Sequence, residues 1–63
     1  MTVNGKPAPY EPMTLLDYLL RGGYNPARVV VERGREIITK ERFGDITLLE
    51  EDQLNILQFM GGG

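Results

Sequence analysis

A single stretch of this chain has the periodicity of a helix, and β-type stretches stand on both sides of it. Thr14 is a favourable N-cap residue, and Asp17 follows at the third helical position. The i, i+4 spacing of the helix leucines forms one apolar stripe, which consists of Leu15, Leu16, Leu19 and Leu20. Gly22-Gly23 supplies a glycine that can adopt the left-handed backbone conformation with which helices commonly end. Because a helix this short is marginal in isolation, packing against the strands must hold it.

The first β-type stretch predicts a tight hairpin at the edge of a sheet. Asn4-Gly5 is a strong signal for a two-residue hairpin loop between a strand at residues 2–3 and a return strand from Lys6 to about Tyr10. Pro7 and Pro9 cannot donate to a strand ladder, so we expect this return strand at an edge.

The second half of the chain predicts another hairpin and a last strand. Residues 29–31 are β-branched, residues 33–35 form a turn around Gly34, and residues 36–40 return. After the hairpin, Phe43 should anchor an irregular turn to the core, and residues 46–48 should form a short extended piece. Residues 54–60 form the last strand.

One helix serves at least four strands, so the chain is of the α+β class and its helix covers only one face of the sheet. In the last strand, alternation places Leu54 and Ile56 on one side and Leu57 and Phe59 on the other. If the first pair packs under the helix, the second pair points outward. We predict one domain over residues 1–60, followed by a flexible glycine tail at residues 61–63.

Composition excludes several classes of function. The 63 residues contain no cysteine and no histidine, which removes a thiolate nucleophile, the commonest general base and the commonest metal ligand. The 7 basic residues are interleaved with 9 acidic ones, an arrangement that argues against a nucleic-acid surface. No apolar run approaches the roughly 20 residues that span a bilayer. We therefore expect a cytoplasmic protein that is no enzyme and holds no metal.

The triglycine end is the strongest candidate for chemistry. Glycine has the highest ordering cost of any residue and adds nothing to a core, but three glycines form a thin thread without side chains. We predict that Gly61 and Gly62 pass through a narrow channel of a partner protein. The terminal carboxylate of Gly63 then becomes the reacting group, because glycine does not hinder an incoming nucleophile.

The surface offers candidate contacts near the glycines. Leu57, Phe59 and Val30 are predicted to anchor the body of the domain on a partner. The acidic run Glu50-Glu51-Asp52 is predicted to be a solvated turn.

Several motifs, in order along the chain, give it a family resemblance. They are Val-Asn-Gly near the start, Thr-Leu and Leu-Leu in the helix, Val-Val-Val-Glu-Arg followed by Glu-Ile-Ile, then Lys-Glu-Arg-Phe, and Phe-Met-Gly-Gly-Gly at the end. With these motifs the chain resembles the sulfur carrier family of thiamin biosynthesis, called ThiS, over essentially its whole length. One departure is Glu51-Asp52, where many members have Gly-Asp.

The resemblance implies a ubiquitin-like β-grasp fold with a mixed sheet of four to five strands. It also implies that an E1-like adenylating enzyme uses ATP and magnesium to form an acyl-adenylate on Gly63, with no cofactor bound to the carrier itself. Sulfur from a donor such as a cysteine desulfurase then replaces AMP and leaves a thiocarboxylate. Thiazole synthase takes this sulfur to build the thiazole of thiamin.

Three other functions remain open from the residues alone. The chain could carry sulfur for another pathway, such as molybdopterin synthesis. It could be a ubiquitin-like modifier joined to lysines through Gly63. It could also be a non-covalent interaction module with an idle tail.

Overall fold

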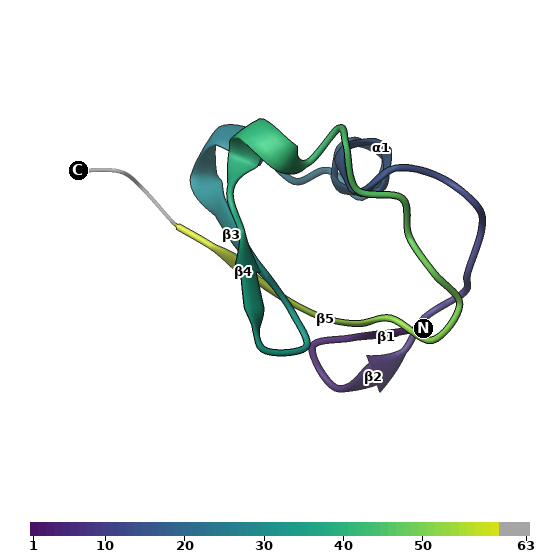
Figure 1. The fold of residues 1–63 in the computed structure, drawn as a ribbon. Coiled ribbons are helices and arrows are strands. Elements are labelled where there is room, and N and C mark those ends of the chain that lie inside the picture. The colour runs from purple at the N-terminus through teal and green to yellow at the C-terminus, as the bar shows by residue number, and fades with distance from the viewer. Residues whose placement is uncertain (60–63) are drawn as a thin grey trace.

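In residues 1–59, the part of the chain that this computed structural model describes, five strands form one mixed sheet and one helix lies across one of its faces (Figure 1). The strands are β1 (Thr2–Val3), β2 (Lys6–Pro7), β3 (Val29–Arg33), β4 (Glu36–Ile38) and β5 (Gln53–Gln58). The helix is α1 (Leu15–Arg21), and two 3₁₀ turns are η1 (Pro26–Arg28) and η2 (Lys40–Arg42). The predicted α+β class is confirmed. The predicted domain boundary after residue 60 lies outside the described residues.

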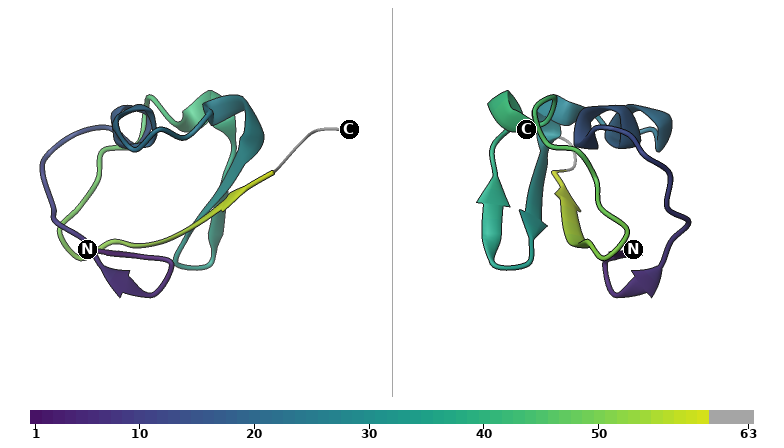
Figure 2. Two further views of the ribbon diagram at one scale, coloured as in Figure 1. Left: turned by 180° about the vertical axis from the view of Figure 1, so that it is seen from behind. Right: turned by 45° about the vertical axis from the view of Figure 1, so that its right-hand side comes forward.

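The last strand of the chain lies in the middle of the sheet. The strand order is β2-β1-β5-β3-β4, with β1 and β5 parallel and the other neighbours antiparallel. The β1–β2 hairpin therefore lies on one side of β5 and the β3–β4 hairpin on the other, as the right-hand view of Figure 2 shows. The chain completes its core only when β5 is in place.

The turns form where the sequence predicts them. Asn4 and Gly5 both have positive φ, 53° and 82°, which is the requirement of a type I′ hairpin turn. The return strand β2 ends at Pro7 and does not reach Tyr10, so the predicted strand is too long. It lies at the edge of the sheet as predicted. In the second hairpin, β4 likewise ends at Ile38, two residues earlier than predicted.

Helix α1 begins as predicted but buries only part of its leucine stripe. The Thr14 Oγ1 accepts a hydrogen bond of 3.1 Å from the Asp17 N–H, which confirms the N-cap. Leu15 and Leu19 are fully buried, whereas Leu20 is 56% exposed. At about 100° per residue, Leu20 lies roughly 140° around the helix from Leu15. Leu20 therefore lies at the edge of the predicted apolar stripe and stays exposed, whereas Leu15 and Leu19 form its buried centre.

The core lies between α1 and the covered face of the sheet. Its ten buried apolar residues are Leu15, Leu19, Val29, Val31, Ile38, Phe43, Ile46, Leu48, Leu54 and Ile56. Phe43 is 1% exposed and anchors its turn as predicted. Residues 46–48 form no strand; Thr47 makes one isolated bridge with Thr14, while the side chains on either side of it enter the core.

Candidate functional site

The described part of the candidate site is the end of β5. Gly61, Gly62 and Gly63 lie outside the described residues, so the predicted tail and reacting carboxylate stay predictions. Strand β5 has Leu54 and Ile56 buried under the helix at 2% and 4% exposure. Leu57 and Phe59 point to the opposite face and are 64% and 58% exposed. The predicted alternation is confirmed.

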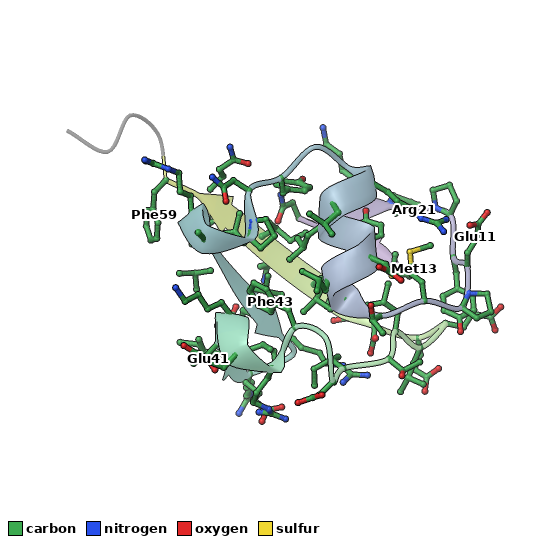
Figure 3. The ribbon with its side chains drawn as sticks, turned by 90° about the horizontal axis from the view of Figure 1, so that it is seen from above. Glu11, Met13, Arg21, Glu41, Phe43 and Phe59 are labelled. Carbon is green, nitrogen blue, oxygen red and sulfur yellow. The ribbon has the colours of Figure 1, made fainter. Side chains whose placement is uncertain are left out.

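The three predicted anchor residues lie close to one another. Val30 of β3 is the cross-strand partner of Leu57, and it is half-buried. The Phe59 N–H donates a hydrogen bond of 2.8 Å to the Arg28 carbonyl, so the antiparallel pairing continues one residue past β5. Leu57, Phe59 and Val30 thus form an apolar patch at the end of the sheet where the chain runs toward Gly63. Figure 3 shows Phe59 on the side of the molecule opposite Glu11, Met13 and Arg21.

The open face changes character along β5. Closer to the start of the strand, Asn55 donates a hydrogen bond of 3.2 Å from Nδ2 to Oε1 of Glu32 on β3. Gln53 is exposed on the same face. The open face is therefore polar beside the first half of β5 and apolar beside the second half.

Asp52 is part of the structure and is not a solvated turn residue. Its side chain is 7% exposed, and its Oδ1 accepts a hydrogen bond of 2.9 Å from the Arg33 Nε. Its Oδ2 accepts a hydrogen bond of 2.7 Å from the Leu49 N–H, and its backbone carbonyl accepts one of 2.9 Å from the Thr2 N–H. The prediction of a solvated acidic turn is wrong at Asp52, because nothing local distinguishes it from the exposed Glu50 and Glu51.

The described residues offer little for catalysis. No group of three acidic, histidine or cysteine side chains among residues 1–59 could hold a metal ion. A hollow of about 540 Å³ beside the start of β5 holds the Arg33–Asp52 pair. A smaller hollow of about 270 Å³ has Glu11 and Arg21 at its rim, paired at 3.5 Å. Burial, with Tyr24 adding to it, raises the pKa of Tyr18 beside this smaller hollow. Neither hollow is lined by a serine, threonine, cysteine, lysine or histidine.

Comparison with known proteins places the whole chain in one family. A sequence model of the ThiS family matches residues 1–63. The chain belongs to the ThiS family. The sulfur carrier protein ThiS of Bacillus subtilis is 35% identical over 65 residues, which cover 100% of this chain and 98% of that protein.

A second ThiS-like relative has a different architecture. A thiazole synthase of Magnetococcus marinus is 39% identical over 62 residues, which cover 97% of this chain. The chain spans only 19% of the length of that protein. A ThiS-like segment is thus part of a longer chain that is named for the synthase.

Solved structures agree with the family and the fold. The crystal structure of a thiamine biosynthesis protein (ThiS) from Geobacter metallireducens superposes with a TM-score of 0.80 at 33% identity, covering 98% of this chain and 96% of that one. A solution structure of a Geobacter metallireducens protein gives 0.77 at 35% identity. The predicted β-grasp fold is confirmed.

ThiS membership decides between the alternatives that the residues left open. The chain is a sulfur carrier protein of thiamine biosynthesis, and it is a carrier and not an enzyme. Its partners belong to the thiamine pathway. No helix within residues 1–59 is both long enough and apolar enough to cross a membrane. The predicted cytoplasmic location stays a prediction.

Proposed function

We propose that the chain carries sulfur on the terminal carboxyl group of Gly63, as a thiocarboxylate. The observation that carries this proposal is chemical: a sulfur carrier without cysteine has no side chain on which a persulfide could form. The carboxyl group of Gly63 can be turned into an acyl sulfur species once it is activated. Three consecutive glycines place it at the end of a segment without side chains.

Loading takes place in three steps. A carboxylate oxygen of Gly63 attacks the α-phosphorus of ATP, with magnesium neutralising the phosphates, and pyrophosphate leaves. The outer sulfur of a persulfide on a sulfur donor, such as a cysteine desulfurase, then attacks the acyl carbon, and AMP leaves with the oxygen. A thiol reduces the resulting acyl disulfide, so that the donor cysteine leaves joined to this thiol and a thiocarboxylate remains on Gly63. An E1-like adenylating enzyme supplies the active site for the first step.

Thiazole synthase is the proposed recipient of the sulfur. The synthase of Magnetococcus marinus contains a segment similar to this chain, which supports a physical association between carrier and synthase. We propose that Gly61 and Gly62 enter the channel of each partner while Leu57, Phe59 and Val30 contact its surface. These side chains already lie together at the end of β5.

Intact-mass measurement tests the proposal. The chain is incubated with ATP, magnesium, the adenylating enzyme, a sulfur donor and a thiol reductant, and we expect a mass gain equal to the replacement of one oxygen by sulfur. Deletion of Gly63, or Gly62→Leu, should abolish the gain while the circular dichroism spectrum stays unchanged. A gain that survives deletion of Gly63 would refute the proposal.

A glycine outside the tail provides the matched control. A Cβ added at Gly44 would meet only the Leu16 Cδ2 at 3.8 Å, an ordinary contact, and the backbone there needs no positive φ. Gly44→Ala should therefore load at the normal rate. If it loaded as poorly as Gly62→Leu, the loss would come from the fold and not from the tail.

A further inference from the structure

Strand β5 has neighbours on both sides at its start but on one side only at its end. Strand β3 pairs along it from Arg33↔Leu54 to Val29↔Gln58. Strand β1 pairs only with its first two residues, Gln53 and Leu54. In Figure 1, β5 continues well beyond the β1–β2 hairpin toward its C-terminal end.

The direction of the backbone groups follows from the register. The Phe59 N–H donates to the Arg28 carbonyl, and the Gly34 N–H donates to the Gln53 carbonyl at 3.1 Å. Odd-numbered residues of β5 therefore direct their N–H and C=O groups toward β3. Because these groups alternate along an antiparallel strand, the even-numbered residues direct theirs to the opposite side.

On that opposite side, β1 ends before β5 does. The Asn4 N–H donates a hydrogen bond of 2.8 Å to the Leu54 carbonyl. The backbone then turns away at Asn4-Gly5. The next hydrogen bond to β5 comes from the Asn4 side chain, whose Oδ1 accepts a hydrogen bond of 2.7 Å from the Ile56 N–H. Beyond this contact, the Ile56 carbonyl and the N–H and C=O of Gln58 have no hydrogen-bond partner among residues 1–59.

We propose that this unpaired edge, made of the Ile56 carbonyl and the two backbone groups of Gln58, receives an extended segment of the adenylating enzyme. The segment adds to the sheet as a further strand, in the space that β1 would occupy if it continued straight. Unpaired groups on a strand edge are a template for such addition. One residue of a parallel neighbour bridges the Ile56 carbonyl and the Gln58 N–H, as Asn4 does for Leu54 and Ile56.

The position of this edge favours it over the outer edges of the sheet. Gln58 stands five residues before Gly63, so a strand paired there holds the chain close to the reacting carboxylate. Strand β2 has two residues, one of them Pro7, and is a poor template. The free edge of β4 lies two strands away from β5. The apolar side chains of Leu57 and Phe59 border the unpaired edge and add side-chain contacts.

This inference rests on the proposed loading reaction, and backbone chemistry tests it. A chain of 63 residues is accessible by chemical synthesis, so the Gln58 nitrogen can be methylated, which removes the donor and adds bulk at the edge. The matched control is methylation of the Ile37 nitrogen. Ile37 of β4 lies opposite Glu32 of β3, and the backbone groups of Glu32 point away from β4, toward β5. The two residues therefore form a non-hydrogen-bonded pair, and the Ile37 N–H points to solvent at the free edge of β4.

We expect the unmodified chain and the Ile37-methylated chain to load within about twofold of each other. Methylation at Gln58 should lower kcat/KM for loading by about tenfold or more, mainly through KM, with an unchanged unfolding midpoint. A chain with an ester in place of the Gln58 amide lacks the N–H donor but has no added bulk at the edge. Its kcat/KM for loading should fall by about fivefold. The ester keeps the test decisive if the methylated chain does not fold.

The possible outcomes separate this inference from the proposed function. If the unmodified chain is not loaded at all, the proposed function fails and this inference fails with it. If all folded chains load equally, the added strand is refuted while the proposed function stands. If the Ile37 modification alone impairs loading, the enzyme uses the β4 edge and the inference is wrong.

Discussion

The two halves of strand β5 differ in what surrounds them, although both belong to one strand with one alternation. The first half has β1 and β3 as neighbours, and its outward residues Gln53 and Asn55 are polar. The second half has β3 alone, and its outward residues Leu57 and Phe59 are apolar and exposed. From this difference we infer that the first half of β5 stabilises the domain and that the second half binds partner proteins.

The largest effect should come from truncating the core at the first half. Leu54→Ala removes a side chain that is 2% exposed, and we expect the free energy of unfolding to fall by about 3 kcal/mol. Urea denaturation measures this change. The folded fraction should still load with sulfur at the normal rate. A loss below about 1 kcal/mol would show that the first half does not carry the stability assigned to it.

The next effect should come from the ion pair at the same end. Asp52→Asn removes the charge that partners Arg33 and weakens the acceptor of the Leu49 N–H, so we expect a loss of about 2 kcal/mol. The control is Glu51→Gln at the exposed neighbouring position, which should stay within about 0.5 kcal/mol. Equal unfolding midpoints for the two variants would contradict a structural role for Asp52.

At the second half, the effect should appear in binding and not in stability. Leu57→Ser should change the free energy of unfolding by less than about 0.5 kcal/mol, because the side chain is 64% exposed. It should raise the KM of the carrier for the adenylating enzyme by about tenfold, since an apolar anchor is lost. Leu49→Ser, at an exposed leucine before β5, is the control and should leave KM unchanged. If Leu57→Ser instead lowered the stability and left KM normal, the second half of β5 would stabilise the domain and would not contact the enzyme, contrary to the comparison.

The smallest effect concerns Tyr18, which is remote from the second half of β5. Burial raises its pKa in the folded state above the ordinary value of 10.0, so the unfolded state ionises first as pH rises. The stability that this neutral side chain contributes is therefore present below that value and is lost as pH rises through the raised pKa. Urea midpoints at alkaline pH should fall less steeply for Tyr18→Phe than for the natural chain. Parallel pH profiles would contradict this assignment.

Much of the fold and of the candidate site could be predicted from the sequence, because the signals are local. The Asn4-Gly5 turn, the Thr14 cap and the alternation that exposes Leu57 and Phe59 each depend on a few neighbouring residues. The family motifs and the glycine end belong to the same class, since they are read directly from the order of residues.

Tertiary structure alone decided the features that depend on distant segments. Asp52 is buried because Arg33, 19 residues earlier in the chain, comes beside it through the pairing of β3 with β5. The second half of β5 has no neighbour on the side opposite β3 among residues 1–59, because β1, about 50 residues away, turns at Asn4 after pairing with only two residues of β5. Local sequence determines which conformations a segment prefers, whereas burial and unpaired edges arise only when separate segments meet.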